Sequence, residues 1–121
     1  YCAARFDRLT GLMFVDSGVE KQNGRKAYDE ILRQLDCVRR GEFTDEELTA
    51  TRLLMQTSLE AVGDSLSATE EWYLTQIVGG AQYSAKDESA LLDEVTREDV
   101  IAAAGQVTLD TVYFLTGKEA E

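Results

Sequence analysis

The sequence of 121 residues has no histidine and no proline, and its only cysteines are Cys2 and Cys37. Without histidine, the chain cannot carry Ser-His-Asp or Cys-His catalysis or any zinc site with a histidine ligand. An all-cysteine structural zinc site needs four thiolates and is excluded as well. The cysteine spacing does not demand a disulfide, so we expect two buried free thiols and a cytoplasmic protein. We predict no catalytic residue, no metal ligand and no cofactor in this segment.

Basic side chains are also few, since 12 Lys and Arg stand against 23 Asp and Glu and give a net charge of −11. This balance argues against nucleic acid, whose phosphates are bound through Lys and Arg, and against anionic membranes. A basic partner remains an alternative to a solvated acidic surface that keeps the protein soluble. No run approaches ~18 consecutive apolar residues, and no signal peptide is visible.

The length and the hydrophobic fraction of 44% are ordinary for one globular domain. The chain starts directly in a strand-like run, without an initiator Met. We therefore expect residues 1–121 to form a single domain that is a piece of a longer protein.

Residues 1–18 predict a β-hairpin, with arms at 1–6 and 11–15 and a connection at 7–10. The apolar run from Leu12 to Val15 indicates a strand covered on both faces, or covered on one with Met13 and Val15 partly exposed. Arg5 and Arg8 flank the turn and offer contacts to a substrate carboxylate. Solvated turn arginines are the simpler interpretation.

A first helix is predicted from about Gln22 or Asn23 to Arg40, with Asn23 as its cap and Gly41 just past its end. Apolar residues at helical spacing form its expected buried stripe: Ala27, Tyr28, Ile31, Leu32, Leu35 and Val38.

A second helix starts at a capping box, in which the Thr44 hydroxyl and the Glu47 carboxylate each accept a backbone amide of the first turn. Its expected apolar stripe comprises Leu48, Leu53, Leu54, Leu59 and Val62. The short link at 41–43 predicts that this helix and the first form an antiparallel pair.

A third helix is predicted over 66–78, with a capping box at Ser67 and Glu70 and its end at Gly79-Gly80. Ser84 and Thr96 start two shorter helices, the second of which buries Val100, Ile101 and Ala104. Strand-forming residues at 111–116 predict a closing strand before a polar tail at 118–121. The predicted fold is α+β: an antiparallel hairpin and a C-terminal strand, with about five helices packed on one sheet face.

Other candidate chemistry has simpler structural explanations. General acid-base catalysis needs two tuned carboxylates in one cleft, whereas capping accounts for the paired acids Glu46, Glu47, Glu70 and Glu71. The turn acids Asp7, Asp16 and Asp64 match no calcium loop. Trp72 and Tyr73 offer an aromatic recognition patch, but beside Ile77 core packing is the favoured interpretation.

The order of segments resembles the later half of insulinase-like (pitrilysin-type, M16) zinc metallopeptidases. Residues 1–15 resemble the family's hairpin, with a Tyr-rich strand, a Phe-Asp-Arg turn and a Gly-Leu strand. Residues 43–48 (FTDEEL) resemble a helix start, and 64–65 with 72–74 resemble the next helix. Residues 95–100 (VTREDV) resemble the signature VTKEDV, and 111–117 resemble the closing strand.

This resemblance implies two similar α/β halves that enclose a chamber, with a zinc-binding HxxEH in the first half. The second half helps to hold peptide substrate, and the resemblance assigns that role to Tyr1. Because this chain lacks histidine, it would be the end of the C-terminal half, and zinc would be held elsewhere in the parent protein. The implied partners are a peptide substrate and the catalytic half of the same or a paired protein. We also expect self-association through an unpaired strand edge or through a helix face.

The same resemblance leaves other functions open. Some members of the family lack the zinc motif and act as non-catalytic partner or scaffold subunits. From its charge alone, the chain also suits an independent acidic protein-interaction module.

Overall fold

The structure is a computed structural model that describes residues 1–117, so the predicted polar tail at 118–121 lies outside the described residues. It confirms the α+β class. The elements follow one another as β1 (Cys2–Asp7), β2 (Leu12–Ser17), η1 (Lys21–Asn23), α1 (Gly24–Arg39), α2 (Asp45–Glu60), η2 (Ala61–Asp64), α3 (Leu66–Val78), α4 (Ala85–Leu91), η3 (Leu92–Glu94) and α5 (Arg97–Gln106).

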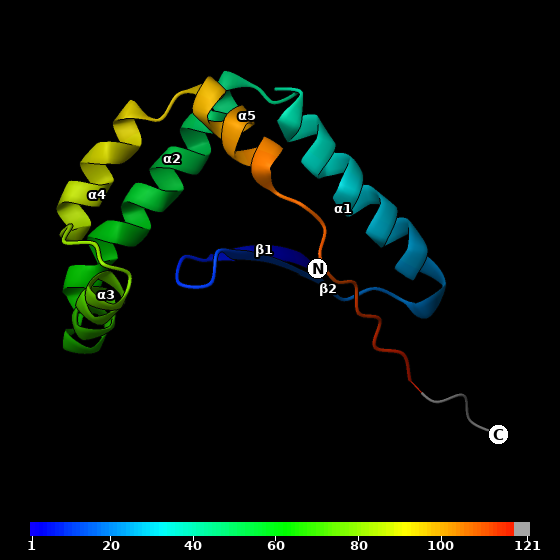
Figure 1. The fold of residues 1–121 in the computed structure, drawn as a ribbon, viewed down its shortest axis with the longest axis horizontal. Coiled ribbons are helices and arrows are strands. Elements are labelled where there is room, and N and C mark those ends of the chain that lie inside the picture. The colour runs from blue at the N-terminus through cyan, green and yellow to red at the C-terminus, as the bar shows by residue number, and fades with distance from the viewer. Residues whose placement is uncertain (118–121) are drawn as a thin grey trace.

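The helices form an arch above the hairpin (Figure 1). One leg is α1, and the other contains α2, α4 and α3. The two legs meet at an apex, from which α5 descends toward α1 (Figure 1). The predicted antiparallel pair of α1 and α2 is therefore wrong, because α1 packs mainly against α5 and α2 packs mainly against α4.

The predicted hairpin is confirmed, with β1 antiparallel to β2 and Asp7 opposite Leu12. Its turn closes through the Gly11 amide, which donates to the Asp7 carbonyl at 2.9 Å. Gly11 has a φ of 69°, a left-handed conformation that favours glycine. Residues 12–16 of β2 are all exposed, so the expected covering of this strand on one or both faces is wrong within residues 1–117.

Helix α1 buries the stripe that its sequence predicts. All six of its apolar residues are half-buried, as are Val100 and Ile101 of the partner helix α5. Arg39 strengthens this contact, because its Nε donates to the Ala104 carbonyl at 3.1 Å and its Nη2 donates to the carbonyl of Val107.

Helix α2 contacts the α4 region largely through polar side chains. Arg52 Nη2 donates to the Val95 carbonyl at 2.8 Å, and Gln56 Nε2 donates to Asp93 Oδ1 at 3.0 Å. Leu53 and Leu54, predicted as part of the buried stripe, are 63% and 68% exposed. The stripe prediction is wrong at these two positions because a polar face of α2 makes the contact.

Arg97 joins the two legs at the apex. Its Nη1 donates to the carbonyls of Gly41 and Phe43 at 3.0 and 2.7 Å, and its Nη2 pairs with Asp45 Oδ1 at 2.6 Å. The guanidinium also lies over the Phe43 ring, 4.4 Å from its centre. Gly41 has a φ of 70°, and a Cβ there would lie 2.8 Å from Ile101 Cδ1, so both backbone and packing favour glycine.

The predicted closing strand at 111–116 is not formed. A strand requires a partner, and within residues 1–117 the strands β1 and β2 pair only with each other. The segment instead runs past α1, where the ring of Phe114 lies 6.3 Å from that of Tyr28.

Little of the described chain is fully buried. Within residues 1–117, only Ala104 and Gln76 are buried, at 8% and 3% exposure. None of the helices in this part of the chain is long and apolar enough to cross a membrane.

Candidate functional site

Tyr1 lies at the open end of the hairpin, just before β1. Its carbonyl accepts hydrogen bonds from the Gly18 amide at 3.1 Å and from Ser17 Oγ at 2.8 Å. Its ring packs on Gly18 so closely that a Cβ on this glycine would lie 2.4 Å from Tyr1 Cε1. The side chain is 80% exposed. Tyr1 therefore presents its phenol to solvent from a main chain that is hydrogen-bonded in place.

The two turn arginines have partners within the chain. Arg5 lies over the ring of Phe14, its cross-strand neighbour, at 5.2 Å from the ring centre. Arg8 Nη1 donates to both carboxylate oxygens of Glu88 on α4, at 2.8 and 3.0 Å. This arrangement attaches the hairpin turn to α4 and supports a structural role for Arg8.

Gln76 completes this attachment and was missed by sequence reasoning. Its Nε2 donates to Glu88 Oε2 at 3.1 Å, while its Oε1 has no hydrogen-bond partner among residues 1–117. Leu9 of the turn lies close by, since its Cδ2 would be 3.6 Å from a Cβ on Gly79. A glutamine within the largely apolar segment 72–78 of α3 was the signal that could have identified a buried polar contact.

The paired acids differ in their capping roles at the two helix starts. Glu47 completes the predicted capping box, because its Oε2 accepts from the Thr44 amide at 2.7 Å. The predicted capping box at Ser67 and Glu70 is wrong. The cap of α3 is Ser65, whose Oγ accepts from the Ala68 amide at 3.1 Å.

Among the turn acids, Asp7 has a local structural role. Asp7 Oδ1 accepts the amides of Leu9 and Thr10 at 2.9 and 3.4 Å. Hydrogen bonds from Thr10 and then from Leu9 lower the pKa of Asp7. No group of three or more His, Cys, Asp or Glu in residues 1–117 is arranged to hold a metal ion.

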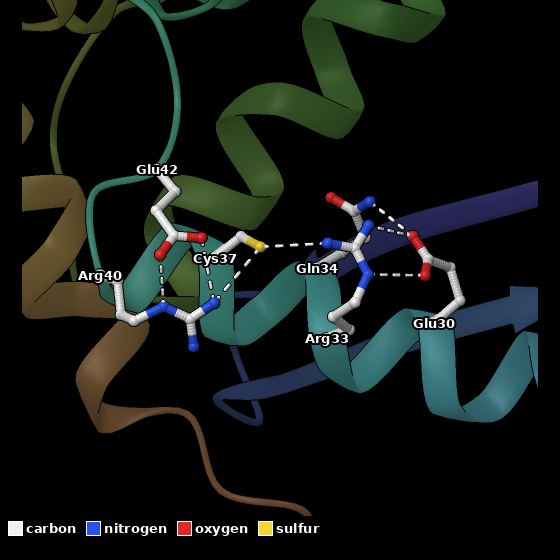
Figure 2. Close-up of polar contacts among 6 residues, drawn as sticks. All are labelled: Glu30, Arg33, Gln34, Cys37, Arg40 and Glu42. Atoms are coloured by element: carbon white, nitrogen blue, oxygen red, sulfur yellow. Dashed lines mark hydrogen bonds and ion pairs between the residues drawn. The ribbon is translucent and has the colours of Figure 1, made fainter.

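The two cysteines are free, and the expectation that both are buried is wrong. Cys2 is exposed on β1, and Cys37 is half-buried on α1. Cys37 Sγ lies between two guanidinium groups, with Arg33 Nη1 at 3.5 Å and Arg40 Nη2 at 3.6 Å (Figure 2).

Each of these arginines is also held by a carboxylate. Arg33 donates to both oxygens of Glu30 at 2.7 and 2.6 Å, and Arg40 donates to both oxygens of Glu42 at 2.6 and 3.0 Å (Figure 2). Hydrogen bonds from Arg33 and then Gln34 lower the pKa of Glu30 to about 2. The two guanidinium groups and the two carboxylates of this network balance in charge. This balance fits a surface that stabilises α1.

A groove of about 510 Å³ lies where the end of α2, η2, α3 and the start of α4 come together. Its apolar lining includes Leu59, Val62 and Trp72, all half-buried. Trp72 Nε1 donates to the Tyr83 carbonyl at 3.3 Å. Tyr73 also lines the groove and is 49% exposed, so the prediction of core packing for Tyr73 is wrong.

One curated protein provides a comparison. The chain is 29% identical over 119 residues to a Bacillus subtilis (strain 168) protein named "Probable inactive metalloprotease YmfF". The alignment covers 98% of this chain and 28% of that protein. No family model matches the chain, and no solved structure gives a significant match. The similarity supports the predicted relationship to M16-like proteins without locating this chain in a particular half of them.

Proposed function

We propose that this chain is a non-catalytic part of an insulinase-like (M16) protein, and that it helps to hold a peptide while another part carries out any cleavage. The observation that carries the proposal is the similarity, over 98% of the chain, to a protein named as a probable inactive metalloprotease. The order of sequence segments described above is consistent with it. The peptide-holding role, the cytoplasmic location and the catalytic partner all belong to the proposal.

The residues of this chain do not fit a zinc ion. Histidine is absent from the sequence, and the two cysteines lie on separate elements, β1 and α1. A hydrolytic zinc site requires ligands such as two histidines and a carboxylate. We therefore assign no step of peptide hydrolysis to this chain.

Tyr1 is the proposed peptide contact. An exposed phenol next to a free strand edge offers a flat apolar surface and one hydrogen-bonding hydroxyl. In the longer protein, Tyr1→Ala should raise the KM for a peptide substrate about two- to tenfold and leave kcat nearly unchanged, as expected when binding is lost equally in the ground state and the transition state. Tyr1→Phe separates the contribution of the hydroxyl from that of the ring.

Tyr113→Ala is the matched control, because Tyr113 is 81% exposed and Tyr1 is 80% exposed. Equal effects of the two substitutions on KM would contradict a specific role for Tyr1. If the longer protein has no peptidase activity, the affinity for a fluorescent peptide replaces KM as the measurement.

A second candidate is a non-catalytic partner or scaffold subunit, favoured by the word "inactive" in the name of the B. subtilis protein. An HxxEH motif in the longer protein, with peptide hydrolysis that a chelator abolishes, would favour the first candidate. Absence of both would favour the second. The acidic interaction module remains the third, and stable monomeric folding of residues 1–121 with capture of a basic protein would favour it.

Self-association through the strand edges is also part of this proposal. Within residues 1–117, β1 and β2 each pair on one side only, so each keeps a free edge. Free edges recruit other strands unless they are protected. Sedimentation velocity should show a larger species as concentration rises, and a monomer at every concentration would contradict the idea.

A further inference from the structure

The groove beside Trp72 is large enough to hold a small ligand. Its volume of about 510 Å³ lies within the range of about 300–1,000 Å³ that is typical of such sites. Leu59, Val62 and Trp72 supply the apolar and aromatic surface, and Thr69, Ser84 and Ser89 supply hydroxyls. A large apolar side chain would displace water from this surface, with a gain of about 25 cal/mol for each Å² that it covers.

Two charged side chains of opposite sign belong to the lining. Glu60 ends α2, and Lys86 lies in the first turn of α4. Both are exposed, and neither has a hydrogen bond or ion pair among the residues that the structure describes, while Lys86 interacts electrostatically with the carboxylate of its neighbour Asp87. They therefore differ from the arginines of this chain, whose guanidinium groups are mostly engaged by carboxylates or carbonyls.

We propose that this groove binds short free peptides that carry a large apolar side chain. The apolar side chain lies against Trp72, the terminal ammonium pairs with Glu60, and the terminal carboxylate pairs with Lys86. A ligand with one charge would satisfy only one of the two side chains, whereas a zwitterion is complementary to both. The choice of a peptide rather than another zwitterion rests on the proposed function.

Trp72 makes the proposal directly measurable, because it is the only tryptophan of the chain. Its emission is recorded in the full 121-residue chain while phenylalanyl-alanine is added. We expect a saturable change in emission. The N-acetylated and C-amidated forms of the same dipeptide should each bind about two- to fivefold more weakly, as expected for exposed ion pairs, and the doubly blocked form should bind most weakly.

Substitution of each charged residue should remove one preference and leave the other. Glu60→Gln should abolish the preference for a free amino terminus, and Lys86→Gln should abolish the preference for a free carboxylate. Combining each substitution with each blocked peptide tests pairing between specific groups. A general loss of folding would instead weaken the binding of all four forms of the peptide together.

Gly63 allows the groove to be blocked. A Cβ at Gly63 meets no atom within 4 Å, and neither does one at Gly105 in α5, which is not part of the lining. Gly63→Leu should weaken binding of phenylalanyl-alanine at least about tenfold by filling the groove. The matched control Gly105→Leu should bind as the unaltered chain does.

Several results would overturn the proposal. They are the absence of a saturable emission change, equal binding of the free and doubly blocked peptides, and equal behaviour of the Gly63→Leu and Gly105→Leu variants. An emission change that follows protein concentration instead of peptide would assign the groove to a second copy of the chain. Failure of the peptide-holding function is seen separately, in the KM of Tyr1 variants of the longer protein, which does not depend on Trp72.

Discussion

Helices α1 and α2 have the same length, 16 residues, but the chain holds them in different ways. Helix α1 directs its apolar stripe toward α5 and the C-terminal segment, where Ile31 and Leu35 are half-buried. Helix α2 contacts α4 through Arg52 and Gln56 and leaves Leu54 exposed. Tertiary packing therefore contributes more to α1 than to α2.

At their N-terminal caps the two helices differ in the opposite sense, with more local hydrogen bonding in α2 than in α1. Helix α2 begins with a complete capping box at Thr44, whereas Asn23 before α1 makes no side-chain cap bond. Local hydrogen bonds at its first turn thus stabilise α2, and buried apolar surface stabilises α1. Two helices of equal length therefore depend on separate sources of stability within one chain.

The largest expected effect comes from the joint between the two legs. Arg97→Ala removes the hydrogen bonds to two carbonyls of the link and the ion pair with Asp45, so it should lower the free energy of unfolding by about 1.5–3 kcal/mol. Urea denaturation followed by circular dichroism measures the change. The control Arg25→Ala removes an exposed pair with Asp29 and should cost less than about 0.5 kcal/mol. Equal losses would show that Arg97 does not hold the legs together.

Truncation of one leucine in each helix tests the difference in packing between α1 and α2. Leu35→Ala in α1 should cost about 1–2 kcal/mol, because a half-buried side chain loses its packing. Leu54→Ala in α2 should cost less than about 0.5 kcal/mol in this chain, because Leu54 is 68% exposed. The same urea titration compares the two, and a larger loss at Leu54 would contradict the assignment of packing to α1.

Removal of the cap side chain should destabilise α2 more than α1, the reverse of the effect of leucine truncation. Thr44→Ala removes the hydroxyl that accepts the Glu47 amide at 3.1 Å and should cost about 1 kcal/mol. Asn23→Ala removes no such bond and should be close to neutral. Thermal unfolding of the two variants in parallel measures the difference. A costly Asn23→Ala would mean that Asn23 does cap α1 in solution.

The smallest effect concerns the surface of α1. The pKa of Glu30 is about 2, lowered first by Arg33 and then by Gln34, against an ordinary value of 4.5. A lowered pKa in the folded state means that this pair stabilises the fold above about pH 4.5, and that the contribution disappears as the pH falls toward 2. Arg33→Gln should raise the pKa of Glu30, as measured by carbon NMR of its carboxyl group. An unchanged value would show that Arg33 is not the cause.

Helix starts were predictable where a side chain accepts a backbone amide of the first turn only three residues away. Thr44, Ser84 and Thr96 each form the predicted cap within four consecutive residues. The third start was predicted at Ser67 but lies at Ser65. Both serines can accept an amide, and the choice depends on where η2 ends, which the local pattern does not reveal.

The candidate sites were less predictable than the helices. The groove beside Trp72 joins residues from four elements, and no spacing along the chain indicates that Glu60 and Lys86 line one surface. The attachment of Arg8 to Glu88 spans 80 positions for the same reason. Tyr1 was selected by resemblance alone, and its role stays a prediction.

The sequence by itself determined the α+β class, the hairpin, the helix order and the absence of a histidine-based reaction, because these depend on composition and on contacts between near neighbours. Only the tertiary structure decided that the legs diverge, that α2 turns a polar face inward and that residues 111–116 stay unpaired. Such outcomes depend on which distant surfaces are present to be covered. A strand-forming or apolar segment carries the tendency to pack, but its partner must come from another part of the fold.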